Sequence, residues 1–312
     1  MKKPIRARIF NFFFKPSSPY PLAFLRISVA LLLITQLLWL YKSLPLLYGH
    51  QALIPWPVSQ AIMGNYTPNI EWVAGYADYL HISPDDVLWI FIGVYLFVLV
   101  VFLLGIFTRV MAVLVWALHY MLVNTGFMSA YGVESFAHII LFYCIFMPVG
   151  NAWSFDARKG NKQADNEWNT LSVRVLQLHL CIIYFFSGIE KAVGIQWWNG
   201  EAIWRTLMQD QFKQFDMSWM AYYPWVAKII CWSTLLLEIG YPFYMWGTAS
   251  RKYGLIAIIL LHLGIAVFLG LQLFAVIMII FSVAAFGKLK PRKALGHSGA
   301  AAQKITESSI IF

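Results

Sequence analysis

Residues 87–106 read VLWIFIGVYLFVLVVFLLGI, a run of apolar residues without a charge. At the 1.5 Å rise of an α-helix, such a run crosses the roughly 30 Å hydrocarbon core of a bilayer. Segments of similar length and composition recur along the chain. Because 60% of its 312 residues are hydrophobic and 12% are charged, it cannot hide its apolar surface in one water-soluble core. The sequence therefore predicts an all-α, polytopic bundle of transmembrane helices.

Eight membrane-spanning segments are predicted. They lie at 21–42, 87–106, 109–126, 132–150, 171–191, 224–247, 252–269 and 271–287. The last two come from a single apolar run, 253–287, that is interrupted only at Gly270 and Gln272. One helix of that length would extend about 52 Å, which exceeds the thickness of a bilayer core. We therefore expect a tight hairpin near Gly270.

The cationic residues fall in short clusters that flank the apolar segments. The clusters are Lys2, Lys3, Arg6, Arg8 and Lys15, then Arg109, then Arg158, Lys159 and Lys162, then Arg251 and Lys252, and finally Lys288, Lys290, Arg292 and Lys293. With eight spans all of them lie on one side, whereas the connection 43–86 has acidic residues and no Lys or Arg. The positive-inside rule places both termini in the cytoplasm, and we expect a multi-pass protein of the bacterial inner (plasma) membrane. Since the cations flank spans, the net charge of +9 does not indicate a nucleic-acid partner.

Three regions are predicted: a basic cytoplasmic N-terminus (1–16), a transmembrane domain (17–290) and a disordered cytoplasmic tail (291–312). The cysteines, Cys144, Cys181 and Cys231, lie within predicted spans and form no CxxC motif. The sequence therefore predicts no metal site and no disulfide framework.

Two long connections lie on the predicted outer side, at 43–86 and 192–223. The first combines prolines with tryptophans and tyrosines, which suits ordered loops and short helices at the membrane interface. In the second, apolar residues fall on one helical face, namely Ile203, Trp204, Leu207 and Met208. We expect interfacial helices on the outer side, above a cavity that opens outward beside Lys191.

The fifth segment ends in a Glu-Lys pair: residues 184–191 read YFFSGIEK, and WWNG follows at 197–200. A lysine at the membrane border is partly desolvated, which disfavours its charged form and allows the amine to act as a base near neutral pH. Alternatively, Lys191 extends to the headgroups beside an aromatic belt and has no chemical role. The residues leave both interpretations open.

Ionisable residues also lie inside the predicted spans. His119, His138 and His262 are each 6–8 residues from an outer end, about 9–12 Å below the outer surface. Such residues usually face the bundle interior and mark functional paths, although each could be a core histidine bonded to a backbone carbonyl. We do not expect haem, because the usual pairing of two histidines per helix is absent. Glu238 is deeper and requires a partner or a proton.

Three stretches resemble the vitamin K-dependent gamma-carboxylase family. Residues 184–191, with Trp197 downstream, resemble the family segment that carries the catalytic lysine, and Lys191 stands in its place. NAWSFD at 151–156, and His262 followed by GLQLF at 270–274, resemble two further stretches in the same order. Together they resemble the HTTM (horizontally transferred transmembrane) domain over roughly 17–290.

The resemblance implies a quinol-dependent carboxylase or epoxidase, a lyase. In that family the lysine deprotonates reduced vitamin K, and oxygen then converts the quinol to an epoxide by way of a strong base that removes a proton from a substrate glutamate before CO₂ adds. The cofactor implied is reduced vitamin K or another quinol. The candidate catalytic residues are Lys191, Glu190 and His262, and the candidate cofactor-binding residues are Tyr184, Trp197, Trp198, His138 and His119.

The chain departs from the family pattern in three places. The carboxylase has a large, mostly β lumenal region after its membrane domain, whereas fewer than 30 residues follow the last span here. The family's adjacent lysine is Glu190, and 124–132 lacks the histidine found there in the carboxylase. These departures support a second hypothesis, a non-catalytic membrane accessory protein for the maturation or export of a small peptide. The expected partners are the lipid bilayer and either a lipid-soluble small molecule or an exported peptide.

Overall fold

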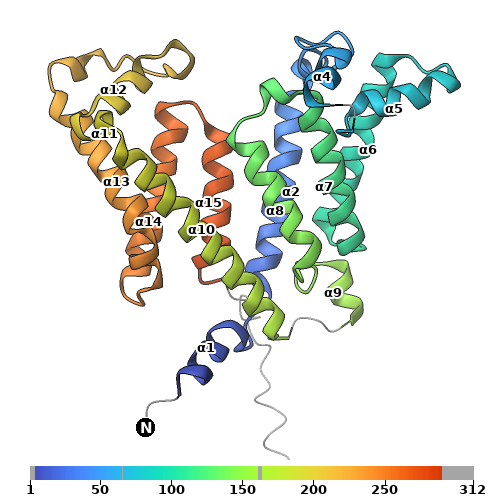
Figure 1. The fold of residues 1–312 in the computed structure, drawn as a ribbon. Coiled ribbons are helices and arrows are strands. Elements are labelled where there is room, and N and C mark those ends of the chain that lie inside the picture. The colour runs from blue at the N-terminus through green and yellow to red at the C-terminus, as the bar shows by residue number, and fades with distance from the viewer. Residues whose placement is uncertain (1–3, 65, 161–163, 290–312) are drawn as a thin grey trace, which may run out of the picture.

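The chain folds as a bundle of helices (Figure 1). The computed structural model describes residues 4–64, 66–160 and 164–289, and over these ranges it contains α-helices and short 3₁₀ helices but no named strand. Within the described ranges, five helices are long and apolar enough to cross a membrane. They are α2 (Tyr20–Trp39), α6 (Pro84–Leu104), α10 (Glu167–Val193), α13 (Pro224–Trp246) and α14 (Ser250–Phe268). The predicted all-α class and membrane assignment are confirmed.

Three further helices belong to the same bundle: α7 (Thr108–Thr125), α8 (Gly132–Phe146) and α15 (Gln272–Phe286). Helix α7 packs against α6 and α8, and α15 packs against α2 and α14. Helices α8 and α15 are apolar but have only 15 residues each. Each of the eight segments predicted from the sequence is therefore a helix, with ends a few residues from those expected.

Proline and glycine determine where two of these helices stop. Helix α8 ends at Phe146, short of the predicted 150, because Met147 precedes Pro148 and takes an extended backbone with φ −80° and ψ 148°. Gly270, between α14 and α15, has φ +70°, a left-handed conformation that favours glycine. The predicted hairpin is confirmed.

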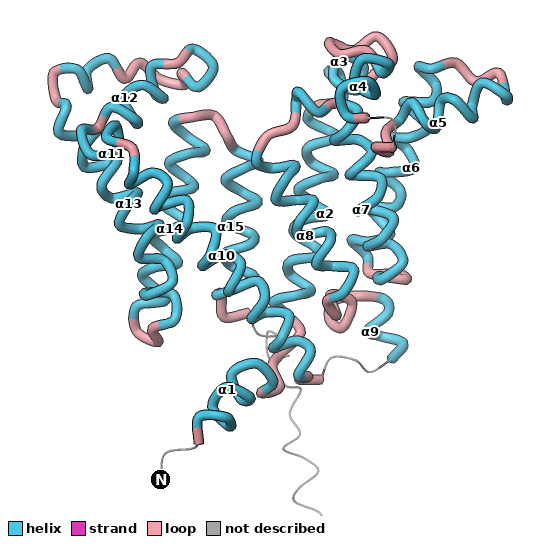
Figure 2. Tube along the Cα trace, in the orientation of Figure 1, coloured by secondary structure: helices cyan, strands magenta, loops and turns pink. Residues whose placement is uncertain are grey.

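Short helices lie at the two ends of the bundle (Figure 2). At one end, called here the α11/α12 end, are α3 (Leu44–Tyr48), α4 (Trp56–Met63), α5 (Ile70–Ala77), α11 (Ile195–Asn199) and α12 (Glu201–Met208). At the opposite, α1/α9 end are α1 (Ile5–Phe14) and α9 (Phe155–Gly160). Helix α1 falls within the predicted N-terminal region 1–16, whereas the predicted tail 291–312 lies outside the described residues.

Arg26, in the first turns of α2, is fully buried. Its guanidinium donates hydrogen bonds to the carbonyls of Val149 (2.9 Å), Ala152 (3.5 Å) and Trp153 (2.5 Å), in the turn that follows α8. A Cβ on Gly105 would come within 2.8 Å of the Arg26 Nη1, so glycine is needed there to admit the guanidinium. These carbonyls explain how an apolar helix accommodates an arginine.

Hydrogen bonds join the chain before α2 to the start of α10. Ser17 and Asn166 form an isolated antiparallel bridge, and the Asn169 side-chain amide donates to the Ser17 carbonyl at 2.8 Å. The Thr170 hydroxyl donates to the Lys15 carbonyl. We call this set of bonds the N-terminal clasp.

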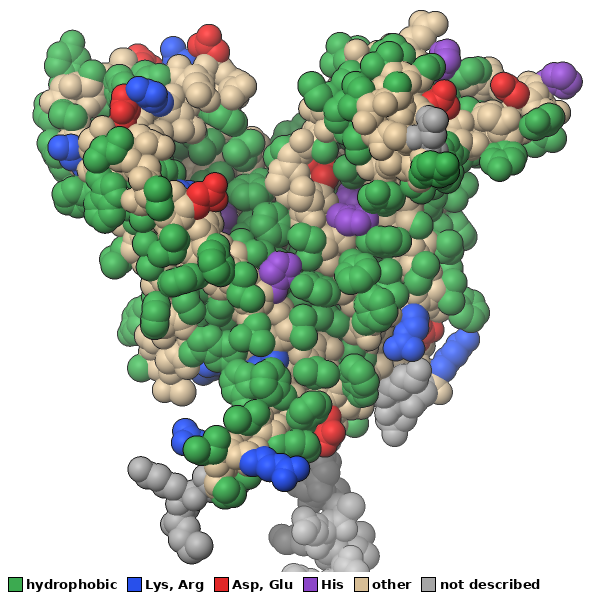
Figure 3. All heavy atoms as spheres, in the orientation of Figure 1, with side chains coloured by type: hydrophobic (Ala, Val, Ile, Leu, Met, Phe, Trp, Pro, Cys, Tyr) green, Lys and Arg blue, Asp and Glu red, His purple; other side chains and the backbone are tan. Residues whose placement is uncertain are grey.

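The α11/α12 end is divided into two raised parts. One consists of α11, α12 and the adjoining end of α13, and the other contains α4 and α5 (Figure 1). Figure 3 shows that the surface between them is hollowed into a notch rimmed largely by hydrophobic side chains. The end of α10 that carries Lys191 is on the α11 side of this notch.

Candidate functional site

Lys191, in the last turn of α10, forms an ion pair with Glu238 of α13. The Lys191 Nζ lies 2.8 Å from the Glu238 Oε2, and it also donates a hydrogen bond to the Ser187 hydroxyl one turn earlier. The Lys191 side chain is 26% exposed and the Glu238 side chain 10%. The Lys191 side chain is therefore partly accessible, while its carboxylate partner is almost enclosed.

The local sequence of α10 builds one face of this site. Tyr184, Ser187, Gly188 and Lys191 are spaced i, i+3, i+4 and i+7, so they share a helix face. A Cβ on Gly188 would lie 2.8 Å from the Ile239 backbone nitrogen and 3.0 Å from the Glu238 Cβ. Because Gly188 has no side chain, α10 and α13 approach closely and Glu238 comes within reach of Lys191.

Trp197, in α11, completes the surroundings of the amine. The Lys191 Nζ lies 5.6 Å from the centre of the Trp197 ring, within the range of a cation–π contact. Trp198 is 51% exposed and instead donates its indole N–H to the Ala192 carbonyl at 2.7 Å. Glu190 is exposed, since successive helical residues point in different directions. Of the residues near Lys191 in sequence, Trp197 thus faces the amine, whereas Trp198 and Glu190 do not.

The Lys191–Glu238 pair can move a proton without changing its own net charge. An ammonium beside a carboxylate and an amine beside a carboxylic acid hold the same number of protons. Water favours the charged arrangement, and an apolar ligand that displaces water reduces this preference, because burial penalises charges. The arrangement is suited to acid–base chemistry on a hydroxyl or amine that reaches the exposed part of Lys191.

A second polar contact lies deeper on α10. The Tyr184 hydroxyl and the His262 Nε2 of α14 are 2.6 Å apart, and both side chains are 3% exposed. Tyr184 also stacks on Tyr241 of α13, with ring centroids 4.3 Å apart. The structure therefore brings His262 of α14 together with Tyr184, which lies on the same helix as Lys191.

His119 and His138 belong to a different cluster, on α7 and α8. Their rings stack with centroids 6.1 Å apart, and the His119 Nδ1 lies 3.0 Å from the Tyr95 hydroxyl of α6. Beside them the Gln36 amide donates to the Glu134 carboxylate at 2.6 Å. In the described part of the chain, neither histidine forms a hydrogen bond or a ring contact with His262. The three histidines predicted at one depth thus divide between two sites.

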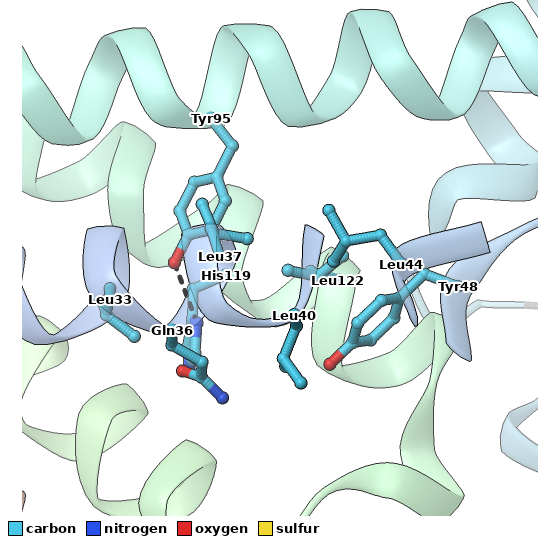
Figure 4. A pocket seen from close by; sticks show the side chains of 9 residues that line it. All are labelled: Leu33, Gln36, Leu37, Leu40, Leu44, Tyr48, Tyr95, His119 and Leu122. Carbon is cyan, nitrogen blue, oxygen red and sulfur yellow. Dashed lines mark hydrogen bonds between the residues drawn. The ribbon is translucent and has the colours of Figure 1, made fainter. Parts of the chain in front are cut away.

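A small cavity adjoins this second cluster (Figure 4). Its volume is about 10 Å³, which is room for about one water molecule. Figure 4 shows the Tyr95 hydroxyl directed at the His119 ring, with Gln36 beside it and Tyr48 further along the cavity. The space is too small for a quinol, and every polar group named here except Tyr48 has a partner in the cluster.

Metal ligands are not assembled in the described ranges, where no group of three or more His, Cys, Asp or Glu side chains could hold an ion. The cysteines are free and buried. The groups of the site with chemical potential are therefore its ionisable and aromatic side chains.

The sequence analysis predicts that Glu238 needs a partner but does not identify Lys191 as that partner. It also misses two members of the site, Ser187 and Tyr241. The helical spacing of Ser187 from Lys191 could have indicated Ser187, because the two residues share a helix face. The spacing of three residues between Glu238 and Tyr241 could have indicated Tyr241 in the same way. The partner of Glu238 could not be found in this way, because it depends on how two helices meet.

The family follows from a comparison of the whole chain. Residues 14–288 match the family model of the HTTM domain. The chain belongs to the HTTM family. The match includes α2 through α15 and both polar clusters, so the predicted resemblance is confirmed for the domain. No curated protein and no solved structure matches this HTTM protein.

Proposed function

We propose that this HTTM protein is a quinol-dependent enzyme of the carboxylase type, with Lys191 as the base. The observation that carries the proposal is the Lys191–Glu238 pair, a reachable amine bonded to an enclosed carboxylate at the end of a membrane helix. The HTTM family assignment supports it, since Lys191 occupies the position of the catalytic lysine in the resemblance. Trp197 offers an apolar, aromatic surface beside the amine.

The proton movements follow from the ion pair. When an apolar quinol displaces water, the Lys191 proton shifts to Glu238, which leaves a neutral amine next to a carboxylic acid. The amine then takes the proton of the quinol hydroxyl and becomes an ammonium beside the quinolate. In this proposal Glu238 accepts the proton of Lys191 and so produces the neutral amine that acts as the base. Glu238 becomes negatively charged again when it releases that proton.

The oxidant in this proposal is molecular oxygen. One oxygen atom would enter the quinone ring as the epoxide. The other would leave as hydroxide with the second hydrogen of the quinol, while Lys191 holds the first, and would become water when it takes a proton. The quinol is oxidised by four electrons and dioxygen is reduced by four. The strong base formed on the way would take a proton from a carbon acid such as a glutamate side chain, to which CO₂ would add.

The proposal includes an orientation. We infer eight membrane spans with both termini in the cytoplasm of a bacterium, with the α11/α12 end outward and its short helices in the outer interface. The cations Arg109, Lys159, Arg251 and Lys288 occur at the α1/α9 end, which supports a cytoplasmic position for that end. Lys191 then faces the outside, where lipid-soluble molecules enter through the outer leaflet.

Epoxide formation tests the function. Purified protein in lipid nanodiscs is incubated with reduced vitamin K and oxygen, and the epoxide is separated and measured by chromatography. We expect epoxide from the wild type and none above background from Lys191→Arg, because a guanidinium stays protonated. Circular dichroism and gel filtration check that the variant is folded. An unchanged rate in a folded Lys191→Arg protein would refute the enzymatic proposal.

A second candidate function is supported by the notch at the α11/α12 end. Exposed aromatic side chains occur on both of its raised parts, for example Tyr66 and Tyr222, which are 94% and 84% exposed. Such surfaces suit an accessory protein that holds a small exported peptide. In that case Lys191→Arg would keep its biological function, and a photo-crosslinker at Tyr222 would capture the peptide in cells that produce it.

A further inference from the structure

Four side chains form a buried polar cluster inward of the Lys191–Glu238 pair. They come from four different helices and are each at most 3% exposed: Tyr184 of α10, Tyr241 of α13, His262 of α14 and Ser282 of α15. Tyr184 bonds His262 at 2.6 Å and stacks on Tyr241 at 4.3 Å. We call these residues the inner polar cluster.

Three atoms of the inner polar cluster have no hydrogen-bond partner in the described chain: the Tyr241 hydroxyl, the His262 Nδ1 and the Ser282 hydroxyl. Both phenols lie near the Ser282 hydroxyl, but the geometry of a hydrogen bond is not met. Buried polar atoms are almost always paired, and internal water supplies the missing partners in most proteins. Three unpaired atoms in one place therefore indicate a site for bound water.

The two phenols of the inner polar cluster lie inward of the ion pair, on the two helices that carry it. Tyr184 precedes Lys191 by seven residues on the same face of α10, which places it about 10 Å further into the membrane. On α13, Tyr241 follows Glu238 by three residues and so lies one turn deeper on the same face. Each of the two interacting helices thus carries one member of the ion pair and one phenol of the inner polar cluster.

We propose that the inner polar cluster, completed by bound water, is a proton relay from Glu238 to His262. This inference rests on the proposed function, in which Glu238 holds the proton that Lys191 gives up. A water between Glu238 and Tyr241 accepts that proton and passes one of its own to the hydroxyls of Tyr241, Ser282 and Tyr184 in turn. Each hydroxyl takes one proton and gives one. The last proton arrives at the His262 Nε2 as the Nδ1 proton leaves to the water beside it, so the ring stays neutral.

The two possible states of His262 suit this role. If the Tyr184 hydroxyl donates to Nε2, the ring proton sits on Nδ1, and that N–H needs a water as acceptor. If Nε2 carries the proton, it donates to Tyr184, and the Tyr184 hydroxyl turns toward Ser282. The relay therefore has two hydrogen-bond directions that differ by the rotation of hydroxyl groups and a change of ring tautomer.

Enzymatic turnover provides the first test, and the fold provides a matched control. A second Tyr–His pair, Tyr143 and His179, has its hydroxyl and Nδ1 2.7 Å apart on α8 and α10, away from Lys191. In the epoxide assay we expect Tyr241→Phe and His262→Gln to lower kcat about tenfold or more, with KM little changed and a larger solvent deuterium effect. Tyr143→Phe and His179→Gln should behave as wild type. Equal effects in both pairs would overturn the relay.

A second measurement does not depend on activity. In protein labelled with ¹⁵N-histidine, the ring nitrogens of His262 are identified by their loss in His262→Gln, and Lys191→Met is then compared with wild type. We expect Lys191→Met to shift the His262 ring resonances and leave those of His179 in place. An unmoved His262 resonance would refute the relay even if epoxide is formed. If the wild type forms no epoxide, the proposed function fails and this measurement alone decides the relay.

Discussion

Two carboxylates could pair with Lys191: Glu190, its neighbour in sequence, and Glu238, which is 47 residues away. In the fold, Lys191 pairs with Glu238. Glu190 is its neighbour but points to solvent, whereas Glu238 arrives from α13 and bonds the amine at 2.8 Å. An exposed carboxylate interacts weakly through water, while the enclosed Glu238 interacts through a less polar medium. The chemistry of Lys191 is therefore expected to depend on Glu238.

Substitution of each carboxylate by its amide tests this dependence. Glu238→Gln should lower epoxide formation about 100-fold or more, the usual contribution of a positioned acid or base, because the amine loses its proton acceptor. Glu190→Gln should remain within about twofold of wild type, since surface charges contribute little. The two variants are measured side by side in nanodiscs. The assignment of Glu238 would be wrong if Glu190→Gln were the more damaging change.

At the residue scale, the sequence indicates which side chains are candidates for the site but not which of them lie together in the fold. Lys191, Tyr184, Trp197 and His262 were predicted as site residues from a resemblance, and the structure gathers them around α10 and α13. His119 and His138 lie in the separate cluster of α7 and α8. The depth of a residue in the membrane can be predicted by counting residues along its helix. Which other helices its side chain faces cannot, because that depends on how segments distant in sequence pack together.

Helices α10 and α13 meet through Gly188, and this contact sets the geometry of the site. The residue sits in a helix of ordinary geometry, so its role is to permit close approach rather than an unusual backbone conformation. Small residues at such contacts are typical of membrane helix packing. Gly188, about one helical turn before Lys191, therefore helps to set the distance between Lys191 and Glu238.

Gly188→Ala is expected to separate the two helices. Its Cβ would lie 2.8 Å from the Ile239 nitrogen, a backbone atom that cannot rotate away, and overpacking of this kind costs about 1–3 kcal/mol. Gly264→Ala in α14 is the matched control, because nothing lies within 4 Å of its added Cβ. Thermal unfolding in detergent should show a lower Tm for Gly188→Ala and no fall for Gly264→Ala. Equal melting temperatures would show that the close contact is not needed.

At the element scale, the sequence predicted all eight apolar helices of the bundle. Their composition and length determine them, and Gly270 marks the hairpin that divides 253–287. The predicted end of α8 at residue 150 is wrong, because Pro148 favours an extended backbone at Met147 and the helix ends at Phe146. Which helices touch could not be predicted, since apolar faces in a membrane have no polar side to orient them.

The orientation of the whole molecule can be tested with single cysteines. The native cysteines are buried, so an added thiol on the surface should dominate labelling. Cysteine at Tyr66 or Gln211, both exposed at the α11/α12 end, should react with an impermeant thiol reagent in intact cells, whereas cysteine at Lys159 should react only after lysis. Labelling of Lys159→Cys in intact cells, with none at Tyr66→Cys, would reverse the proposed orientation.

The N-terminal clasp can form only late in the synthesis of the protein. Ser17 and its partner Asn169 are separated by 152 residues, so at about 5–20 residues per second the ribosome needs about 8–30 s to deliver the second after the first. Arg26 and Trp153 are 127 residues apart, so the interval between their synthesis is almost as long. Of the bundle helices that pack against α2, only α6 and α8 precede Trp153 in the chain. The first membrane helix to be synthesised thus waits until α8 has been made for the hydrogen bonds of Arg26.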